Sequence, residues 1–319
     1  MTDDTPPSVS SRDTRPWRAA WRDCHLGSGG FYRHHNAEDE FSTGVHADDT
    51  LARYLADLIA RQRANDPGED FAVIDIGAGA GRLLADLRKL LPGGITFIGI
   101  DVRSRPANLD ETITWIEREI DPSSSDITGQ DGHWSGVLIA HEFLDDIPCD
   151  VVELDDNCDP RIVLVDPTTG AQELGPVLTD RAVHRFTDEP ERDRAWLAQW
   201  WPPTRPGARR EIGWPRDVVW NRLRRVVSNG QAIAIDYGHE RVDRLRGVWD
   251  GGTLKGFASG RPRRPIPNNT MNITAHVALD ACASDHASVL PQSQVLPGLA
   301  GFPGGRGSYR WLIEPRLGR

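Results

Sequence analysis

The segment at residues 73–82, with the sequence VIDIGAGAGR, constrains the fold more than any other part of this chain. The apolar run Phe71–Ile76 predicts a buried strand that carries one carboxylate, Asp75, near its end. Glycines follow at alternate positions, and leucines at helical spacing over 83–91 predict a helix directly after them. An α/β sheet uses this order of strand, glycine turn and helix to bring bare backbone against a nucleotide-like ligand.

The spacing of Gly77, Gly79 and Gly81 narrows the class of ligand. A dinucleotide-binding turn has the pattern G-x-G-x-x-G, but Arg82 stands where its third glycine belongs. No Gly-Lys-Ser/Thr follows, which excludes a P-loop. The pattern D-x-G-x-G-x-G resembles the first motif of class I S-adenosylmethionine (AdoMet) methyltransferases. For this motif alone, a glycine-rich turn in an unrelated α/β protein is the alternative.

The composition argues against two classes of partner. The net charge of −10 disfavours general binding to nucleic acid or to an anionic membrane, because both need a basic surface. No apolar run is long enough to span a membrane.

The four cysteines form no C-x-x-C pair, so neither a disulfide framework nor a metal site is predicted. A reducing, cytoplasmic location is the simplest expectation.

Strand and turn patterns divide the 319 residues into five expected parts. These are a disordered N-terminus at 1–15, a helical cap at 16–70, a first core part at 71–150, an inserted substrate subdomain at 151–229 and a second core part at 230–319. Within the core, apolar strands are predicted at 95–102, 112–116, 136–140, 231–237 and 308–313. Helices are expected at 48–63 and 218–227, a loop at 251–269 and a short helix at 275–283. Strands that alternate with helices predict a parallel sheet covered on both faces.

Six short segments, in order along the chain, carry a more specific resemblance. They are EFST at 40–43, DIGAGAG at 75–81, HEFLDDIP at 141–148, IDYG at 235–238, GTLKGF at 252–257 and NITAHV at 272–277. In combination they resemble the MidA-like AdoMet-dependent methyltransferases, a family that includes the mitochondrial complex I assembly methyltransferase. Two positions depart from the family pattern, because His141 stands in place of Asn and Asn272 in place of Asp.

The resemblance implies a fold and an activity. The fold would be the class I, Rossmann-like α/β fold, with a mostly parallel seven-stranded sheet, an N-terminal helical cap and an inserted substrate subdomain. The cofactor would be AdoMet, converted to S-adenosylhomocysteine, and the partner a protein substrate. Members of the family are associated with symmetric dimethylation of protein arginine, so arginine is the leading acceptor.

The candidate cofactor residues lie near the ends of three successive predicted strands or in the turns after them. Backbone amides of the glycine turn, at a helix N-terminus, would face the methionine carboxylate of AdoMet, and Asp75 would contact its ammonium group. Asp101 could accept two hydrogen bonds from ribose hydroxyls, and Asp121 could contact the adenine amine. For each aspartate the alternative is a structural role in a turn or cap. The full set is Asp75, Gly77, Gly79, Gly81, Asp101 and Asp121.

The candidate catalytic residues are Glu142, Asp145 and His276. Glu142 and Asp145 are three apart after the fourth core strand, so a helical turn would place both on one side at the ligand edge of the sheet. Arginine stays protonated in water, and two carboxylates could hold its guanidinium and align one nitrogen with the methyl group. Asp145 could instead be a solvated helix-start residue. His276 could accept a proton or simply pack beneath a loop.

Two other functions stay open at this stage. One is a catalytically silent AdoMet-binding assembly factor that acts through protein contacts; Glu142 argues against it and His141 keeps it open. The other is a methyltransferase for a small molecule, which the size of the 151–229 insertion weakly disfavours. Methylation of nucleic acid is disfavoured, because no Asn/Asp-Pro-Pro-Tyr/Phe element follows the fourth strand.

Overall fold

The computed structural model describes residues 13–34, 49–65, 70–124, 134–296 and 309–315. The element at 40–43, and residues 1–12 of the segment expected to be disordered, lie outside the described residues. Arg15, the last residue of that segment, forms the short strand β1 (Arg15–Pro16), which pairs antiparallel with β7 (Pro160–Val165). The ordered chain therefore includes the end of the segment that was expected to be disordered.

The central sheet is mixed and contains eight strands among the described residues. Its order is β15-β16-β10-β5-β2-β3-β4, with β14 beside β10. The neighbouring strands from β10 to β4 are parallel, whereas β16 is antiparallel to both β10 and β15. The predicted α/β class is confirmed. The strands are β2 (Phe71–Ile76), β3 (Thr96–Asp101), β4 (Ile113–Glu117), β5 (Trp134–His141), β10 (Val227–His239), β14 (Val277–Ala278), β15 (Ser288–Pro291) and β16 (Tyr309–Ile313).

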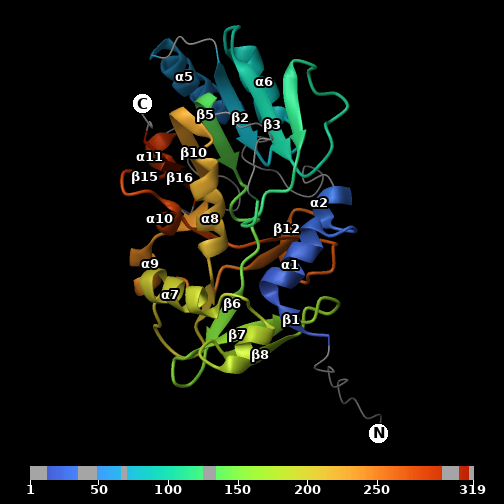
Figure 1. Ribbon diagram of the computed structural model, residues 1–319, viewed down its shortest axis with the longest axis vertical. Coiled ribbons are helices and arrows are strands. Elements are labelled where there is room, and N and C mark those ends of the chain that lie inside the picture. Colours follow the sequence, from blue (N-terminus) through green and yellow to red (C-terminus); the bar gives the residue numbers. More distant parts are fainter. Residues whose placement is uncertain (1–12, 35–48, 66–69, 125–133, 297–308, 316–319) are drawn as a thin grey trace.

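Helices cover both faces of this sheet, as Figure 1 shows in its upper half. Alternate side chains of β2 divide between two hydrophobic clusters, because successive residues of a strand point to opposite faces. Phe71 and Val73 pack with α5 (Thr50–Asn65) and α6 (Arg82–Leu90), whereas Ile74 packs with α8 (Trp214–Leu223) and α10 (Leu279–Cys282). No helix in the described part of the chain is both long and apolar enough to cross a bilayer.

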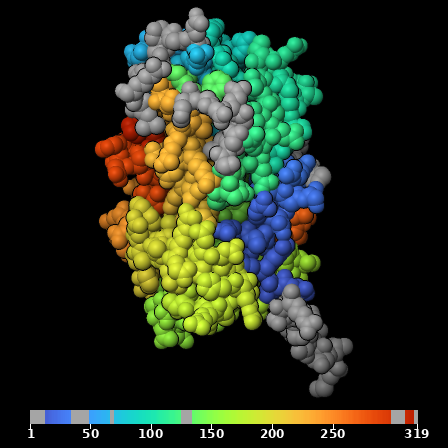
Figure 2. Space-filling model, in the orientation of Figure 1, coloured from blue at the N-terminus to red at the C-terminus, as the bar shows by residue number. Residues whose placement is uncertain are grey.

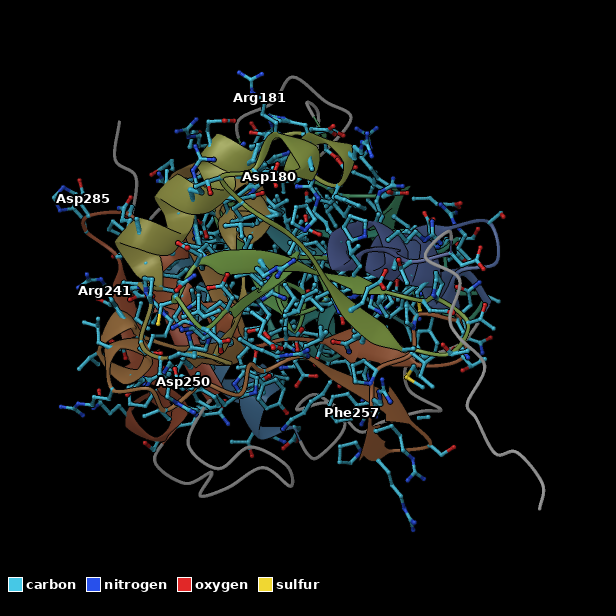
Figure 3. The ribbon with its side chains drawn as sticks, turned by 90° about the horizontal axis from the view of Figure 1, so that it is seen from below. Asp180, Arg181, Arg241, Asp250, Phe257 and Asp285 are labelled. Atoms are coloured by element: carbon cyan, nitrogen blue, oxygen red, sulfur yellow. The ribbon has the colours of Figure 1, made fainter. Side chains whose placement is uncertain are left out.

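A second, antiparallel sheet lies below the first one in Figure 1. The chain between β5 and β10, which contains most of this sheet, forms the yellow-green to yellow lower part of the surface in Figure 2. Apart from β1, its strands belong to the chain between β5 and β10. In Figure 3, Asp180 at the start of η1 and Phe257 of β11 lie on opposite sides of these strands. The helices and strands of the chain between β5 and α8 are β6 (Val151–Leu154), β7, β8 (Gln172–Val177), η1 (Arg181–Arg185), α7 (Pro190–Trp200) and β9 (Arg209–Glu211).

A third sheet, of order β12-β11-β13, corrects the loop expected at 251–269. Strands β11 (Lys255–Ala258) and β12 (Arg261–Arg263) form a hairpin, and β13 (Asn272–Thr274) pairs with β11 on its other side. Ser259 and Gly260 have φ of +50° and +71°, the backbone of a tight two-residue hairpin turn. Of the glycines and prolines that suggested a loop, Gly260 therefore belongs to the turn, Pro262 to the exposed strand β12 and Gly256 to β11.

Two expected helices are displaced in the structure. The helix expected at 218–227 begins earlier, at Trp214, because Pro215 is favourable in the first turn, and Val227 belongs to β10 instead. The segment at 275–283 contributes β14 before the short helix α10 begins. The remaining helices are α1 (Trp17–Leu26), α2 (Phe31–His34), α9 (Arg241–Leu245) and α11 (Gln292–Val295).

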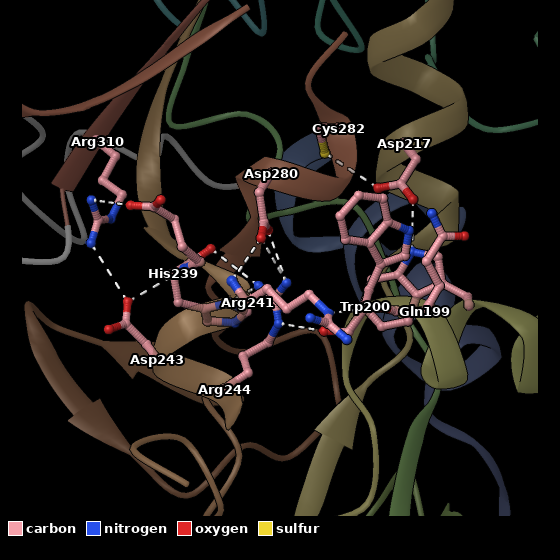
Figure 4. A network of polar contacts seen from close by, with 12 residues as sticks. Gln199, Trp200, Asp217, His239, Arg241, Asp243, Arg244, Asp280, Cys282 and Arg310 are labelled. Carbon is pink, nitrogen blue, oxygen red and sulfur yellow. Dashed lines mark hydrogen bonds and ion pairs between the residues drawn. The ribbon is translucent and has the colours of Figure 1, made fainter. Parts of the chain in front are cut away.

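A buried arginine fixes the end of β10 against three helices (Figure 4). Arg244 on α9 donates to both carboxylate oxygens of Asp280 on α10, at 2.9 and 3.0 Å, and to the Trp200 carbonyl on α7 at 2.9 Å. Its Nη1 also lies 2.8 Å from His239 Nδ1 at the end of β10. Because a fully buried guanidinium needs several acceptors, this arrangement holds the four elements together.

Candidate active site

A cavity of about 830 Å³ lies at the carboxyl ends of the parallel strands. The loops after β2, β3, β4 and β5 line one side of it, and α1, α2 and the third sheet line the other. Every site residue expected from the sequence lines this cavity except Gly81. The lining members of that set are Asp75, Gly77, Gly79, Asp101, Asp121, Glu142, Asp145 and His276.

The glycine turn has the backbone that its sequence predicts. Gly77, Gly79 and Gly81 have φ between +63° and +74°, a left-handed region that other residues adopt only with strain. A Cβ atom on Gly77 would lie 2.7 Å from Cδ2 of Phe143, and real Cβ atoms essentially never approach so closely. Gly77 therefore permits both the turn and the close packing of the β5 loop against it.

The amides of these glycines have acceptors within the protein. Gly77 donates to the Ile100 carbonyl at 2.9 Å, Gly81 to the Ala78 carbonyl at 2.8 Å, and Gly79 to Asp101 Oδ2 at 2.8 Å. All three amides thus bind protein acceptors. The glycines shape the loop, and whether amides of this turn face the methionine carboxylate stays a prediction.

Asp75 is buried at the end of β2 and faces the cavity. Burial, and then the charge of Asp101, raise the pKa of Asp75 to about 8. No hydrogen bond from any of the described residues reaches its carboxylate. A buried carboxyl group without a donor is costly, and a cationic ligand group would relieve that cost.

Asp101 and Asp121 are already engaged by protein donors. The Asp101 carboxylate accepts from the Gly79 amide and, at 2.9 and 3.1 Å, from the amide and Nε of Arg103. A ribose at Asp101 would therefore replace the guanidinium contact. Burial opposes the ionisation of Asp121, but hydrogen bonds from Ser123 and Ser124 outweigh it and lower the pKa of Asp121. Asp121 thus closes a turn, which is the structural alternative considered for it.

The loop after β5 holds Glu142 in a rare conformation. Glu142 has φ of +48°, which for a residue other than glycine marks a constrained backbone and is frequent at functional sites. Its amide donates to the Ile235 carbonyl at 2.9 Å, and its Oε1 accepts from the hydroxyl of Tyr309 at 2.9 Å. The neighbouring His141 Nε2 lies 2.6 Å from the same hydroxyl.

Asp236, within the IDYG segment, anchors this loop and was not among the predicted site residues. Its fully buried carboxylate accepts from the amides of Leu144 at 2.9 Å and Asp145 at 3.2 Å, and from its neighbour Tyr237 at 2.7 Å. A carboxylate in an otherwise apolar strand is a visible signal, because such a group needs several donors. The sequence does not show which loop supplies them.

Carboxyl groups crowd the cavity beside this loop. Burial, and the charges of Asp146 and Glu142, raise the pKa of Asp145 well above its usual range. Burial also raises the pKa of Asp146 to about 7, although a hydrogen bond from Tyr32 acts in the opposite direction. Asp145 is thus buried in the cavity wall and is not a solvated helix-start residue. Like charges in a buried cluster favour the entry of a cation.

Arg216 on α8 joins this loop to the segment after β13 and was also not predicted. Its buried guanidinium donates to the carbonyls of Asp145 at 3.0 Å, Ile147 at 3.2 Å and His276 at 2.8 Å. The three contacts connect residues that are 60 to 71 positions apart in the chain. No local sequence pattern could have revealed this connection.

His276 lies in the cavity wall between two aromatic rings. It stacks on Tyr237 with ring centroids 6.0 Å apart, and meets Trp249 edge-on at 5.0 Å. Burial, and then the charge of Lys255, lower the pKa of His276 to about 4, so its ring is neutral near pH 7. Its Nδ1 is buried without a hydrogen-bond partner among the described residues. The lowered pKa makes this ring a weak proton acceptor near pH 7, and its packing fits the structural alternative.

Comparison with known proteins decides the family. A family model described as "Putative S-adenosyl-L-methionine-dependent methyltransferase" matches residues 98–287, which is more than half of the chain. This chain belongs to that family. AdoMet is accordingly the methyl donor of this methyltransferase.

Solved structures share the fold of this methyltransferase. One is a COG1565 superfamily member from Burkholderia thailandensis bound to S-adenosylhomocysteine, with 17% identity and a TM-score of 0.69 over 94% of this chain and 87% of that one. A native structure from the same organism has 17% identity and a TM-score of 0.70 over 96% and 88% of the two chains. No curated protein is similar enough to this chain to count as a match.

The residues present in the cavity fit AdoMet. The buried carboxylate of Asp75 lacks a donor and could take up the ammonium group, and Asp101 lies beside the glycine turn that a ribose would approach. When bound, AdoMet supplies a methyl group on a sulfonium that a nucleophile can displace. Which atoms each residue touches stays a prediction.

The pKa of Asp75 predicts a pH dependence of ligand binding. An ammonium group favours the ionised carboxylate, so S-adenosylhomocysteine should displace a proton from Asp75 wherever the pH is below about 8. Affinity should therefore fall as the pH is lowered from about 8 to about 6, by up to ~10-fold per pH unit. Calorimetry in two buffers of different ionisation enthalpy measures both the affinity and the released proton.

Two variants test the assignment to Asp75. Asp75→Asn should bind more weakly and lose the pH dependence, whereas Asp86→Asn on α6, outside the cavity, should behave as the wild type. A flat affinity over this range, with no proton released, would show that Asp75 does not meet the ammonium group.

Proposed function

We propose that this methyltransferase transfers the methyl group of AdoMet to a protein side chain, with arginine as the leading acceptor. The observation that carries the proposal is the cluster of Glu142, Asp145 and Asp146 at the end of β5, inside the cavity. Burial and mutual repulsion raise the pKa values of Asp145 and Asp146, so the cluster favours a cationic guest.

A guanidinium is the side chain whose chemistry suits this cluster. It is planar, always charged and a donor of several hydrogen bonds, which matches paired carboxylates better than a single ammonium does. A carboxylate close to one nitrogen would hold that nitrogen in line with the methyl group. It would also stabilise the positive charge that the nitrogen gains as the new N–C bond forms and the S–C bond breaks. The same carboxylate can take the proton that the nitrogen must lose.

The acceptor can be sought directly in the organism's own proteins. Extract from a strain that lacks the gene is incubated with the purified protein and AdoMet carrying a labelled methyl group, and labelled proteins are identified by mass spectrometry. The expected result is a mass increase of about 14 or 28 Da on arginine, for one or two methyl groups. The control is the same extract with S-adenosylhomocysteine in place of AdoMet.

The other outcomes discriminate among the rival functions. Label in the small-molecule fraction alone would assign the enzyme to small-molecule methylation. Binding of AdoMet without label in any fraction would favour a silent assembly factor that acts through protein contacts. Label on lysine or on another side chain would keep a protein acceptor and overturn arginine.

A further inference from the structure

Tyr309 connects two residues of the β5 loop from a distant part of the chain. It is the first residue of β16 and reaches across β10, so that its hydroxyl lies 2.6 Å from His141 Nε2 and 2.9 Å from Glu142 Oε1. Tyr309 is 6% exposed and His141 is 8% exposed. Hydrogen bonds shielded from water in this way are electrostatically stronger than exposed ones.

The two contacts of this hydroxyl require two protons. A tyrosine hydroxyl carries one proton and can accept through its lone pairs, whereas an ionised carboxylate only accepts. When the Tyr309 proton points to Glu142, the contact with His141 needs a proton on Nε2. When His141 Nε2 carries a lone pair instead, it competes with Glu142 for the single proton of Tyr309. The protonation of His141 therefore sets the direction of the Tyr309 hydrogen bond.

The direction matters because Glu142 lies among other ionisable groups, with His141 Nε2 3.8 Å from its Oε1. Asp145 and Asp146 lie on its own loop, and Asp236 and Tyr237 lie on β10 beside it. Arg216 is close to Asp145 and Asp236, but its guanidinium donates to backbone carbonyls. A hydrogen bond donated to a carboxylate favours its ionised form.

We propose that His141 is a positioning residue for Glu142 and acts through Tyr309. Its Nε2–H donates to the Tyr309 hydroxyl, the single proton of Tyr309 is thereby directed to Glu142 Oε1, and Glu142 is kept ionised toward the acceptor. The inference rests on the proposed function, in which Glu142 serves the acceptor. The inference also predicts that the enzyme is active whenever His141 carries a proton on Nε2, whether the ring is neutral or protonated.

The test measures the ionisation of Glu142 without any need for an acceptor. Protein labelled with ¹³C at the glutamate carboxyl groups is titrated and followed by NMR, and Glu142→Gln identifies the Glu142 signal. His141→Phe and Tyr309→Phe should each raise the pKa of Glu142 by about one pH unit, the scale of one hydrogen bond to a charged group. His141→Gln, which retains an N–H near the Nε2 position, should leave this pKa within about a third of that shift.

A second readout links the same residues to the reaction. With the labelled extract proteins as acceptors, the acid limb of the pH–rate profile should move upward in His141→Phe by the same amount as the pKa of Glu142. Affinity for S-adenosylhomocysteine reports that each variant is folded, and His141→Leu replaces His141→Phe if the latter does not fold.

Three results would overturn the inference. They are an unchanged pKa of Glu142 in His141→Phe, an unchanged pKa of Glu142 in Tyr309→Phe, and equal shifts in His141→Gln and His141→Phe, which would indicate packing. Since the titration needs no acceptor, it judges the role of His141 even if no extract protein is methylated. Absence of methylation alone would instead count against the proposed function.

Discussion

Glu142→Gln is expected to lower the rate of methyl transfer by at least ~100-fold, the order of losing an important charge contact in the transition state. Glutamine retains the shape of the side chain and removes its charge, and Glu142 lines the cavity at the end of β5 rather than in the glycine turn. Affinity for S-adenosylhomocysteine should therefore stay within about twofold of the wild type, because this contact belongs to the acceptor.

The measurement combines calorimetry with transfer of a labelled methyl group to extract proteins. Glu117→Gln is the matched control, since Glu117 ends β4 in the same sheet and does not line the cavity. Asp145→Asn should lower the rate more mildly if both carboxylates share one guanidinium. A wild-type rate in folded Glu142→Gln would rule out the carboxylate mechanism, whereas a large loss of S-adenosylhomocysteine affinity would place Glu142 on the cofactor side.

Arg216→Met is expected to lower the free energy of unfolding by about 3–5 kcal/mol, because three buried carbonyls lose a charged donor at once. Those carbonyls belong to Asp145, Ile147 and His276, so the β5 loop and the segment after β13 both lose their anchor. Methionine has a similar length and fills the space, which separates the loss of hydrogen bonds from the creation of a cavity.

Chemical denaturation measures this effect, with Arg225→Met as the control. Arg225 follows α8 closely but is exposed, so its replacement should change the free energy of unfolding by no more than about 0.5 kcal/mol. Arg216→Lys should recover part of the loss, since an ammonium can reach fewer of the three carbonyls than a guanidinium. Equal stability of Arg216→Met and the wild type would mean that water or a rearranged loop satisfies the carbonyls.

Local patterns predicted the framework of the site. The apolar runs that become β2, β3, β5 and β10, and the glycines at alternate positions, depend on the strand period and on backbone conformations that few residues adopt. These properties belong to short stretches of chain, so the sequence is sufficient to recognise them. The carboxyl ends of parallel strands then bring Asp75, Asp101 and Glu142 to one cavity.

The same reasoning was less successful where polar contacts or hairpin geometry decide the structure. The hairpin β11–β12 was expected to be a loop, because its glycines and prolines conceal two short strands that pair only through a tight turn. The amides of Gly77, Gly79 and Gly81 bind the Ile100 and Ala78 carbonyls and Asp101, and the motif did not predict these acceptors. Which acceptor an amide reaches depends on neighbouring strands and loops, and not on its own turn.

The sequence by itself determined the α/β class, the glycine turn after β2 and the carboxylates after successive strands, since each is encoded within a few consecutive residues. Only the tertiary structure decided how the site is held in place. Tyr309 contacts His141, which is 168 positions away in the sequence. Arg216 contacts both the β5 loop and His276, which lie 71 and 60 positions away from it. Such contacts form when packed elements bring distant residues together, so no periodicity or spacing within one segment can reveal them.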